Sequence, residues 1–242
     1  MSLAKWSCAC LMALSLSGVA RAADSIEDVE KKLVEAHSKM KSYTSKTKTV
    51  QNFDMGQGNK MSSDYGGNIE WKRDGEKQMF RTEMKGTTTQ SMGGTDNKME
   101  VSVLMISDGS FLYTLSEQMG QKMATKQKPD TAMTGDPKKL FEKIHSDNTI
   151  KMLPDEKVDG VSTVVFEVIP KDTSASPVAK SIMYFAKDTG INIKVVGKDK
   201  DGKDVFTNTS TDIKLNTEIA SDRFVFKAPE GVQVMDMTGA AP

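Results

Sequence analysis

The sequence predicts an α+β protein built mainly from antiparallel β-strands, with two helices placed on one side or end of a large sheet. Short segments of alternating apolar and polar residues succeed one another along the chain. They are joined by turn signals such as Asp74-Gly75, Asp108-Gly109, Asp188-Thr189-Gly190 and Asp201-Gly202. Helical spacing appears only near residues 24–41 and after Asp136. The 242 residues contain no repeat of 20–50 residues, so we expect one domain.

Residues 1–22 have the features of a signal peptide. Lys5 supplies a positive charge, an apolar stretch runs from Trp6 to Val19, and Ala20-Arg21-Ala22 fits the small-x-small cleavage pattern. The apolar stretch is shorter than the roughly 20 residues that a membrane-spanning helix needs. We therefore expect export to the periplasm, cleavage near Ala22 and a single mature domain over residues 23–242.

Cysteine and charge exclude several classes of function. Cys8 and Cys10 both lie in the expected signal peptide, so the mature chain would have no disulfide and no thiolate nucleophile. Cleavage would remove Lys5 and Arg21, leaving 31 basic against 33 acidic residues and a formal charge of −2. No basic stripe exists to neutralise phosphates, so nucleic acid is not expected as a partner.

The first helix is predicted over residues 24–41. Asp24 or Ser25 can cap it, and two acidic residues follow in the first turn, where the helix dipole favours them. His37 is interpreted as a packed histidine at the edge of the apolar stripe, since no second histidine or carboxylate cluster accompanies it. The stripe consists of Ile26, Val29, Leu33, Ala36 and Met40.

Strand patterns continue as far as Lys126. In the segment Gly67 to Arg73, the side chains of Ile69, Trp71 and Arg73 alternate with charged ones and share one face. The other predicted strands in this half are Ser42 to Phe53, the segment with Phe80 and Met84, Met99 to Ser107, Phe111 to Ser116, and a return segment ending near Lys126.

The second half repeats the order of helix and then hairpins. Asp136-Pro137 signals a helix start, with Asp as the N-cap, and His145 is expected to be exposed at the helix end. A surface loop is expected over Pro129 to Gly135, and a frayed tail after Val234. In the closing strands, Ile191, Ile193 and Val195 share an apolar face.

Catalysis and cofactor binding have little support in the sequence. There is no G-x-S-x-G elbow, and the two histidines fall on separate helices. Fifteen of the 17 methionines lie beyond the expected signal peptide. They can pack an irregular core, line an adaptable cavity, or bind copper, for which Met119 and Met123 are the nearest pair. No further ligand joins that pair in sequence, so no metal site is expected.

A curved sheet of this size has a concave apolar face that short helices cover only in part. Acyl chains can occupy such a face, because each buried CH₂ contributes about 0.8 kcal/mol and a chain of about 16 carbons approaches ~12 kcal/mol before costs. The residues predicted to bind lipid there are Ile69, Trp71, Phe80, Met84, Val103, Met105, Tyr113, Ile193 and Val195, together with Leu33 and Met40 from the first helix.

Three passages, in order, give the chain a resemblance to a known family. The first helix is followed by Tyr43-Thr44-Ser45-Lys46-Thr47. In the middle stand Gly67 to Arg73 and then Ile106-Ser107-Asp108-Gly109. The end, Asp222 to Val232, is close to F-x-F-x-x-P-x-G-V. With these passages the chain resembles the outer-membrane lipoprotein carriers, the LolA/LolB type.

The resemblance implies a curved, half-open β-barrel whose helices form a lid over an apolar cavity for lipoprotein acyl chains or free lipid. It also implies a monomer that exchanges cargo with donor and acceptor proteins of the envelope. In that family an arginine on an early strand bonds lid backbone and latches the empty form, and Arg73 is the matching position. Proline usually comes next there, whereas this chain has Asp74. The alternative for Arg73 is a surface arginine at a strand end.

The leading hypothesis is therefore a non-catalytic periplasmic carrier with an apolar cavity and a movable lid. Two other hypotheses stay open, because fold alone does not assign function. One is an envelope sensor or regulatory binding module of the same fold. The other is a purely structural envelope protein.

Overall fold

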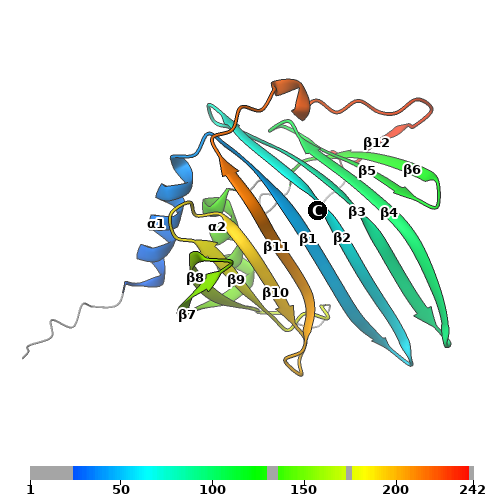
Figure 1. Cartoon of the computed structure of the whole chain (residues 1–242), viewed down its shortest axis with the longest axis horizontal. Coiled ribbons are helices and arrows are strands. Elements are labelled where there is room, and N and C mark those ends of the chain that lie inside the picture. The colour runs from blue at the N-terminus through cyan, green and yellow to red at the C-terminus, as the bar shows by residue number, and fades with distance from the viewer. Residues whose placement is uncertain (1–23, 130–135, 173–175, 240–242) are drawn as a thin grey trace, which may run out of the picture.

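The computed structural model describes residues 24–129, 136–172 and 176–239, and in these residues one curved sheet carries two helices on one face (Figure 1). The expected signal peptide, 1–22, and most of the predicted loop at 129–135 lie outside the described residues. The helices are α1 (Ile26–Ser38) and α2 (Pro137–Asp147). The strands are β1 (Ser42–Gly56), β2 (Asn59–Asp74), β3 (Lys77–Met92), β4 (Thr95–Ser107), β5 (Leu112–Gln118), β6 (Gln121–Gln127), β7 (Asn148–Val158), β8 (Val161–Pro170), β9 (Lys180–Ala186), β10 (Asn192–Lys198), β11 (Asp204–Leu215) and β12 (Val234–Asp236).

The sheet is open, with the strand order β12-β6-β5-β4-β3-β2-β1-β11-β10-β9-β8-β7. All described pairs are antiparallel except the short parallel pair of β12 with β6. Because β12 and β7 form two separate edges, the barrel does not close. The predicted fold class, a half-open antiparallel barrel with a helical lid, is confirmed. We call α1 and α2 together the lid.

The strand register shows which side chains share a face, because directly paired residues point to the same side. We call the face that the lid covers the inner face. A row of paired residues crosses it from β8 to β4: Phe166, Met183, Val195, Asn208, Thr49, Tyr65, Gly86 and Val101. Counting in steps of two from this row places Trp71 and Phe80 on the inner face as well.

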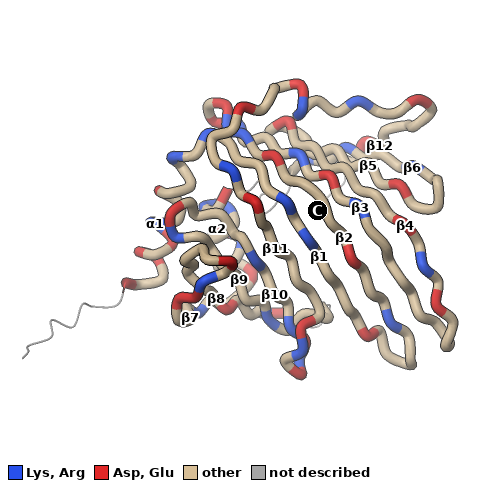
Figure 2. Tube along the Cα trace, viewed as in Figure 1, with Lys and Arg blue, Asp and Glu red and all other residues tan. Residues whose placement is uncertain are grey.

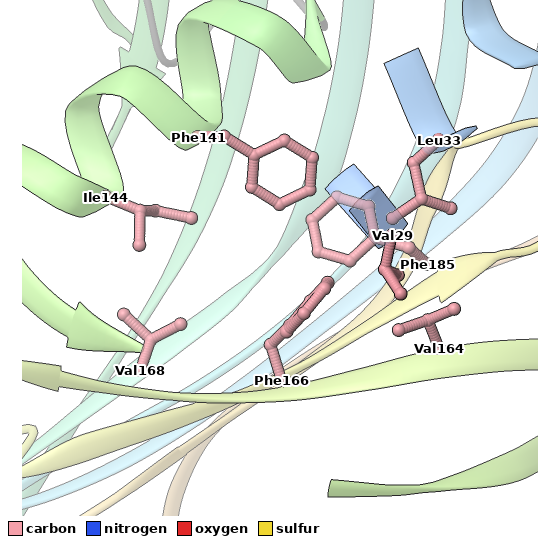
Figure 3. Close-up of a cluster of buried hydrophobic side chains, with 8 residues drawn as sticks. All are labelled: Val29, Leu33, Phe141, Ile144, Val164, Phe166, Val168 and Phe185. Atoms are coloured by element: carbon pink, nitrogen blue, oxygen red, sulfur yellow. The ribbon is translucent and has the colours of Figure 1, made fainter. Parts of the chain in front are cut away.

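The first core cluster fixes the lid to the β8–β9 part of the sheet. Ser25 caps α1 in a capping box with Asp28, and Asp136 caps α2 in front of Pro137. Each helix thus begins where the sequence predicted it, and each turns its apolar stripe toward the inner face. The packed side chains are Val29, Leu33, Phe141, Ile144, Val164, Phe166, Val168 and Phe185 (Figure 3).

The four long strands β1 to β4 extend well beyond the lid (Figure 1). Their inner face changes there from apolar to hydroxyl-bearing side chains, such as Thr47, Thr49, Ser63 and Thr88, which are all buried. Ser63 and Thr88 lie 3.0 Å apart, oxygen to oxygen, and Asn208 donates to the hydroxyls of Thr47 and Thr49. Apolar side chains such as Met84 and Val103 also lie on this part of the inner face, so it is mixed in character.

Gly67 allows two of these strands to approach closely. A Cβ added to Gly67 would lie 1.8 Å from the carbonyl oxygen of Glu83 on β3. Only glycine fits here, because any side chain at this position would collide with the backbone of the neighbouring strand. The glycine is thus required by the local geometry of the β2–β3 pair.

The C-terminal segment crosses the outer face and ends as a strand. The short 3₁₀ helix η2 (Ser221–Phe224) buries Phe224 against Met79 and Ile219. Beyond it, β12 pairs with β6, and Met237 N donates to the carbonyl of Lys126. The expectation of a frayed tail after Val234 was wrong for residues 234–236, because the exposed edge of β6 offers backbone partners.

Charged residues of both signs are interspersed along the strands and turns (Figure 2). Among the described residues, no helix is long and apolar enough to cross a membrane.

Candidate functional site

A cavity of about 280 Å³ lies between the lid and the inner face. It is smaller than the roughly 300–1,000 Å³ of usual ligand pockets. Its wall is mainly apolar and comes from both helices, the β9–β10 turn and five strands. The lining residues are His37, Tyr43, Ile69, Pro137, Leu140, Met183, Phe185, Gly190, Ile191, Asn192, Val195, Asn208 and Ser210.

The structure brings most of the predicted lipid-binding residues to this region, in different roles. Ile69 and Val195 line the cavity directly and are half-buried. Leu33 projects from α1 into the first core cluster, where the lid packs on the sheet. Five other predicted residues form or contact a second packed cluster next to the cavity: Met40, Trp71, Phe80, Ile193 and Met105. Much of the predicted lipid-binding face is thus occupied by the protein's own side chains.

Three predicted residues lie away from the cavity. Met84 and Val103 pair with each other on the inner face of β3 and β4, farther along the strands than the cavity. Tyr113 pairs with Ile106, in register with Arg81, and these residues point to the outer face. Its ring stacks on Phe226, with centroids 5.1 Å apart. The prediction placed Tyr113 on the wrong face of the sheet. The alternation of apolar and polar residues within 111–116 did not show which face the helices cover.

Arg73 connects the end of β2 to the last turn of α1. Its Nη2 lies 3.2 Å from Nδ1 of His37, and its guanidinium carbon lies 5.4 Å from the ring centroid of Trp71. The His37 and Trp71 rings meet edge to face, with centroids 4.8 Å apart. The latch position predicted for Arg73 thus does contact the lid, although the partner in the structure is the His37 side chain. Arg73 also has a buried Nε that finds no hydrogen-bond partner among the residues that the structure describes.

Burial changes the acid–base properties of two residues that line the cavity. Burial, followed by the positive charge of Arg73, lowers the pKa of His37 from 6.5 to about 4, against a smaller opposing effect of Asp136. His37 is therefore neutral at pH 7 and can accept the hydrogen bond from Arg73. Burial also raises the pKa of the Tyr43 phenol to about 12. Its ring stacks on Trp71 at 5.5 Å.

Two more polar contacts hold the lid, and the sequence did not reveal either. Gln78 on β3 donates to Oδ2 of Asp136 over 2.7 Å, so the cap of α2 is bonded to the sheet. Nε2 of His145 lies 3.0 Å from both carboxylate oxygens of the buried Glu30, which joins α2 to α1. His145 is exposed, as predicted. Its contact with Glu30 depends on how the two helices pack, which the spacing of residues in the sequence does not specify.

Other hollows on the molecule fit an acyl chain less well. A pocket of about 340 Å³ under the first half of α1 has an apolar floor, which includes Val29, Leu33 and Val164, and a charged rim. Two larger hollows of about 580 and 500 Å³ are lined mainly by polar and charged residues, such as Lys85, Glu100 and Lys72. Of these hollows, the cavity at the lid has the most apolar wall.

The structure also places the residues considered for metal binding. No group of three or more His, Cys, Asp or Glu that could hold a metal ion occurs in the described part of the chain. Met119 and Met123 lie on the hairpin of β5 and β6 with relative exposures of 76% and 56%. Their thioether groups therefore lie in solvent and are not enclosed as the ligands of a copper site would be.

No family model and no curated protein matches the sequence, whereas solved structures match its fold. An uncharacterized conserved protein from Thermus thermophilus has a TM-score of 0.50 at 9% identity, over 87% of this chain and 98% of that one. A LolA superfamily protein from Nitrosomonas europaea has a TM-score of 0.32 at 11% identity, over 84% of this chain and 99% of that one.

MucB has a TM-score of 0.45 at 16% identity, over 86% of this chain. The match covers 64% of the MucB chain, which is less than two thirds of its length. At such identities the likeness concerns the fold alone.

Proposed function

We propose that the protein is a non-catalytic periplasmic carrier that binds a lipid or lipoprotein acyl chain under the lid and passes it to an envelope acceptor. The observation that supports this proposal is the apolar cavity of about 280 Å³ between the lid and the inner face. The lid is held by apolar packing and by polar contacts, which can break and form again as cargo enters and leaves.

A full acyl chain needs more room than this cavity provides, so binding must move side chains or the lid. The contacts between the lid and the rest of the fold include Arg73–His37, Gln78–Asp136 and the first core cluster. If α1, which carries Leu33, moved away from the sheet, the cavity would also join the pocket of about 340 Å³ beneath the first half of α1. Exchange of cargo would then depend on the opening and closing of α1.

The cavity can be tested by filling it. Val195→Trp would place an indole in the cavity, and Val225→Trp would add the same ring at a residue that is 54% exposed. We expect the wild type and Val225→Trp to bind a fluorescent 16-carbon acyl probe with equal affinity. Val195→Trp should bind it at least about 10-fold more weakly while keeping the native circular dichroism spectrum. Absence of binding by the wild type, or unchanged binding by a folded Val195→Trp, would refute the proposal.

The proposed latch is tested by Arg73→Leu, which removes the contact with His37. The variant should load a labelled lipid but release it to acceptor vesicles more slowly than wild type, because the closed empty form loses its stabilising contact. Lys72→Leu, at the neighbouring residue on the opposite face, serves as the control. Equal transfer rates for Arg73→Leu and wild type would remove Arg73 from the mechanism.

The envelope sensor remains the second candidate, and it would use the same cavity. The two functions differ in the fate of the bound lipid. A carrier transfers the labelled lipid to acceptor membranes, whereas a sensor retains it and changes its affinity for a regulatory protein. The transfer assay therefore separates them.

A further inference from the structure

His37 accepts a hydrogen bond that its protonated form could not accept. Its Nδ1 lies 3.2 Å from Nη2 of Arg73. A guanidinium has donors only, so Nδ1 must carry a lone pair and no proton. The single ring proton of the neutral imidazole is then on Nε2, and a second proton can bind only at Nδ1, the atom that faces Arg73. Protonation of His37 therefore replaces this hydrogen bond by a contact between two cations.

The charged groups that act on His37 do not compensate a second cation. From β2 comes Arg73, whose buried Nε also finds no partner in the described part of the chain. From the start of α2 comes Asp136, whose opposing effect is smaller than that of Arg73. The carboxylate of Asp136 already accepts a hydrogen bond from Gln78. A protonated His37 would thus be a buried cation beside another cation, with no carboxylate bonded to it.

The remaining neighbours do not stabilise a second cation either. Trp71 meets the imidazole edge to face. Tyr43, the titratable residue of β1 at the cavity, is neutral because burial raises its pKa to about 12. The β9–β10 turn contributes Gly190, which has no side chain. On α1 itself, the buried Glu30 lies about two helical turns away and is bonded to His145 of α2.

The contact lies where α1 joins the sheet. His37 is buried in the last turn of α1, and residues 39–41 connect that turn to β1. It also lines the cavity, so its turn is part of the cavity's cover. In an open lid the imidazole is solvated and keeps its usual affinity for protons, whereas burial and Arg73 weaken that affinity in the closed lid. Protons therefore bind the open form more tightly and shift the equilibrium toward it.

We propose that His37 is a pH-sensitive switch: its protonation breaks the contact with Arg73 and releases the last turn of α1 from the sheet, so that the lid opens in acid. At neutral pH the same contact keeps the cavity covered. The inference concerns the movement of the lid and does not depend on what the cavity binds. Its failure would leave the proposed carrier function standing, and failure of the carrier function would leave the switch standing.

Hydrogen exchange of the full chain at pH 7 and pH 4, corrected for the intrinsic exchange rate at each pH, measures the opening of the lid. The amides of α1 report lid opening, and those of the central strands β1 to β3 report global unfolding. Two variants are compared with the wild type. His37→Gln keeps an acceptor for Arg73 but does not titrate, and His145→Gln removes the other histidine of the chain.

We expect the amides of wild-type α1 to be less protected than those of the central strands. Their protection should fall by about 100-fold from pH 7 to pH 4, as the difference between a pKa of 6.5 and one of about 4 gives. His145→Gln should show a similar fall, and His37→Gln should largely lose it. The inference would be overturned by an unchanged protection of wild-type α1, by an equal fall in His37→Gln, or by loss of the fall in His145→Gln. Equal protection of α1 and the central strands would overturn it too, because the opening would then be global unfolding.

Discussion

His37 is the residue at which lid, cavity and strand end meet. It is 2% exposed, contacts Arg73 and Trp71, and lines the cavity. Helical spacing predicted its position at the edge of the packed stripe of α1, and that position is confirmed. Its contact with Arg73 could not be predicted, because 36 residues separate the two positions.

His37 should make stability depend on pH. Its pKa is about 4 in the folded protein and about 6.5 when unfolded, so below pH 6.5 the unfolded chain binds a proton that the folded chain does not. Stability is therefore lost as the pH falls from about 6.5 toward 4, by up to about 3 kcal/mol. Urea unfolding at pH 7 and pH 5 measures this loss. His37→Gln should lose less stability than wild type over the same interval; an identical loss would show that other groups cause it.

At the scale of elements, the docking of α1 depends on Gly190 in the turn between β9 and β10. Its φ is +69°, and an added Cβ would lie 2.2 Å from the carbonyl oxygen of Leu33. The turn therefore touches the backbone of α1 directly. The sequence predicted a turn at this position from Asp188-Thr189-Gly190. It could not predict the helix contact, which joins residues more than 150 positions apart.

Gly190→Ala tests this contact. Gly202 has a φ of +81° and nothing within 4 Å of an added Cβ, so Gly202→Ala measures the backbone cost alone, roughly 1–2 kcal/mol. Gly190→Ala should destabilise more than Gly202→Ala and should speed hydrogen exchange in α1. Equal effects of the two substitutions on the unfolding free energy would contradict the contact.

The C-terminal segment is a second element whose role can be measured. Phe224 is 1% exposed in its cluster, whereas its neighbour Val225 is 54% exposed. Phe224→Ala should reduce the unfolding free energy by about 3–5 kcal/mol, and Val225→Ala by at most about 0.5 kcal/mol. Chemical denaturation of both variants provides the comparison. A loss for Phe224→Ala as small as that for Val225→Ala would mean that the segment contributes little to stability.

At the scale of the whole molecule, the elements and the fold class could be predicted from local patterns. Turn pairs, cap signals and alternation predicted both helices and most strands, since these features depend on residues close in sequence. The size of the cavity could not be predicted in this way. The predicted lipid-binding face treated Trp71, Phe80 and Ile193 as lining, whereas they pack against one another. Whether a side chain lines a hollow or fills it depends on contacts between distant strands.

The hydroxyl-rich half of the inner face was also missed. Thr47 and Thr49 alternate as strand residues do, and both are buried beside Asn208 of the neighbouring strand, a contact that local spacing does not specify. Their hydroxyls make this part of the inner face more polar than the part under the lid. The inner face therefore combines an apolar cavity at the lid with a mixed, hydroxyl-bearing surface farther along the long strands.

The central claim, that an acyl chain occupies the cavity under the lid, is tested most directly by native mass spectrometry of the protein purified from the cells that naturally produce it. We predict an added mass that fragmentation identifies as a molecule with an acyl chain, and its loss in Val195→Trp but not in Val225→Trp. A wild-type protein that carries no lipid, and takes up none from lipid vesicles in the same measurement, would contradict the account.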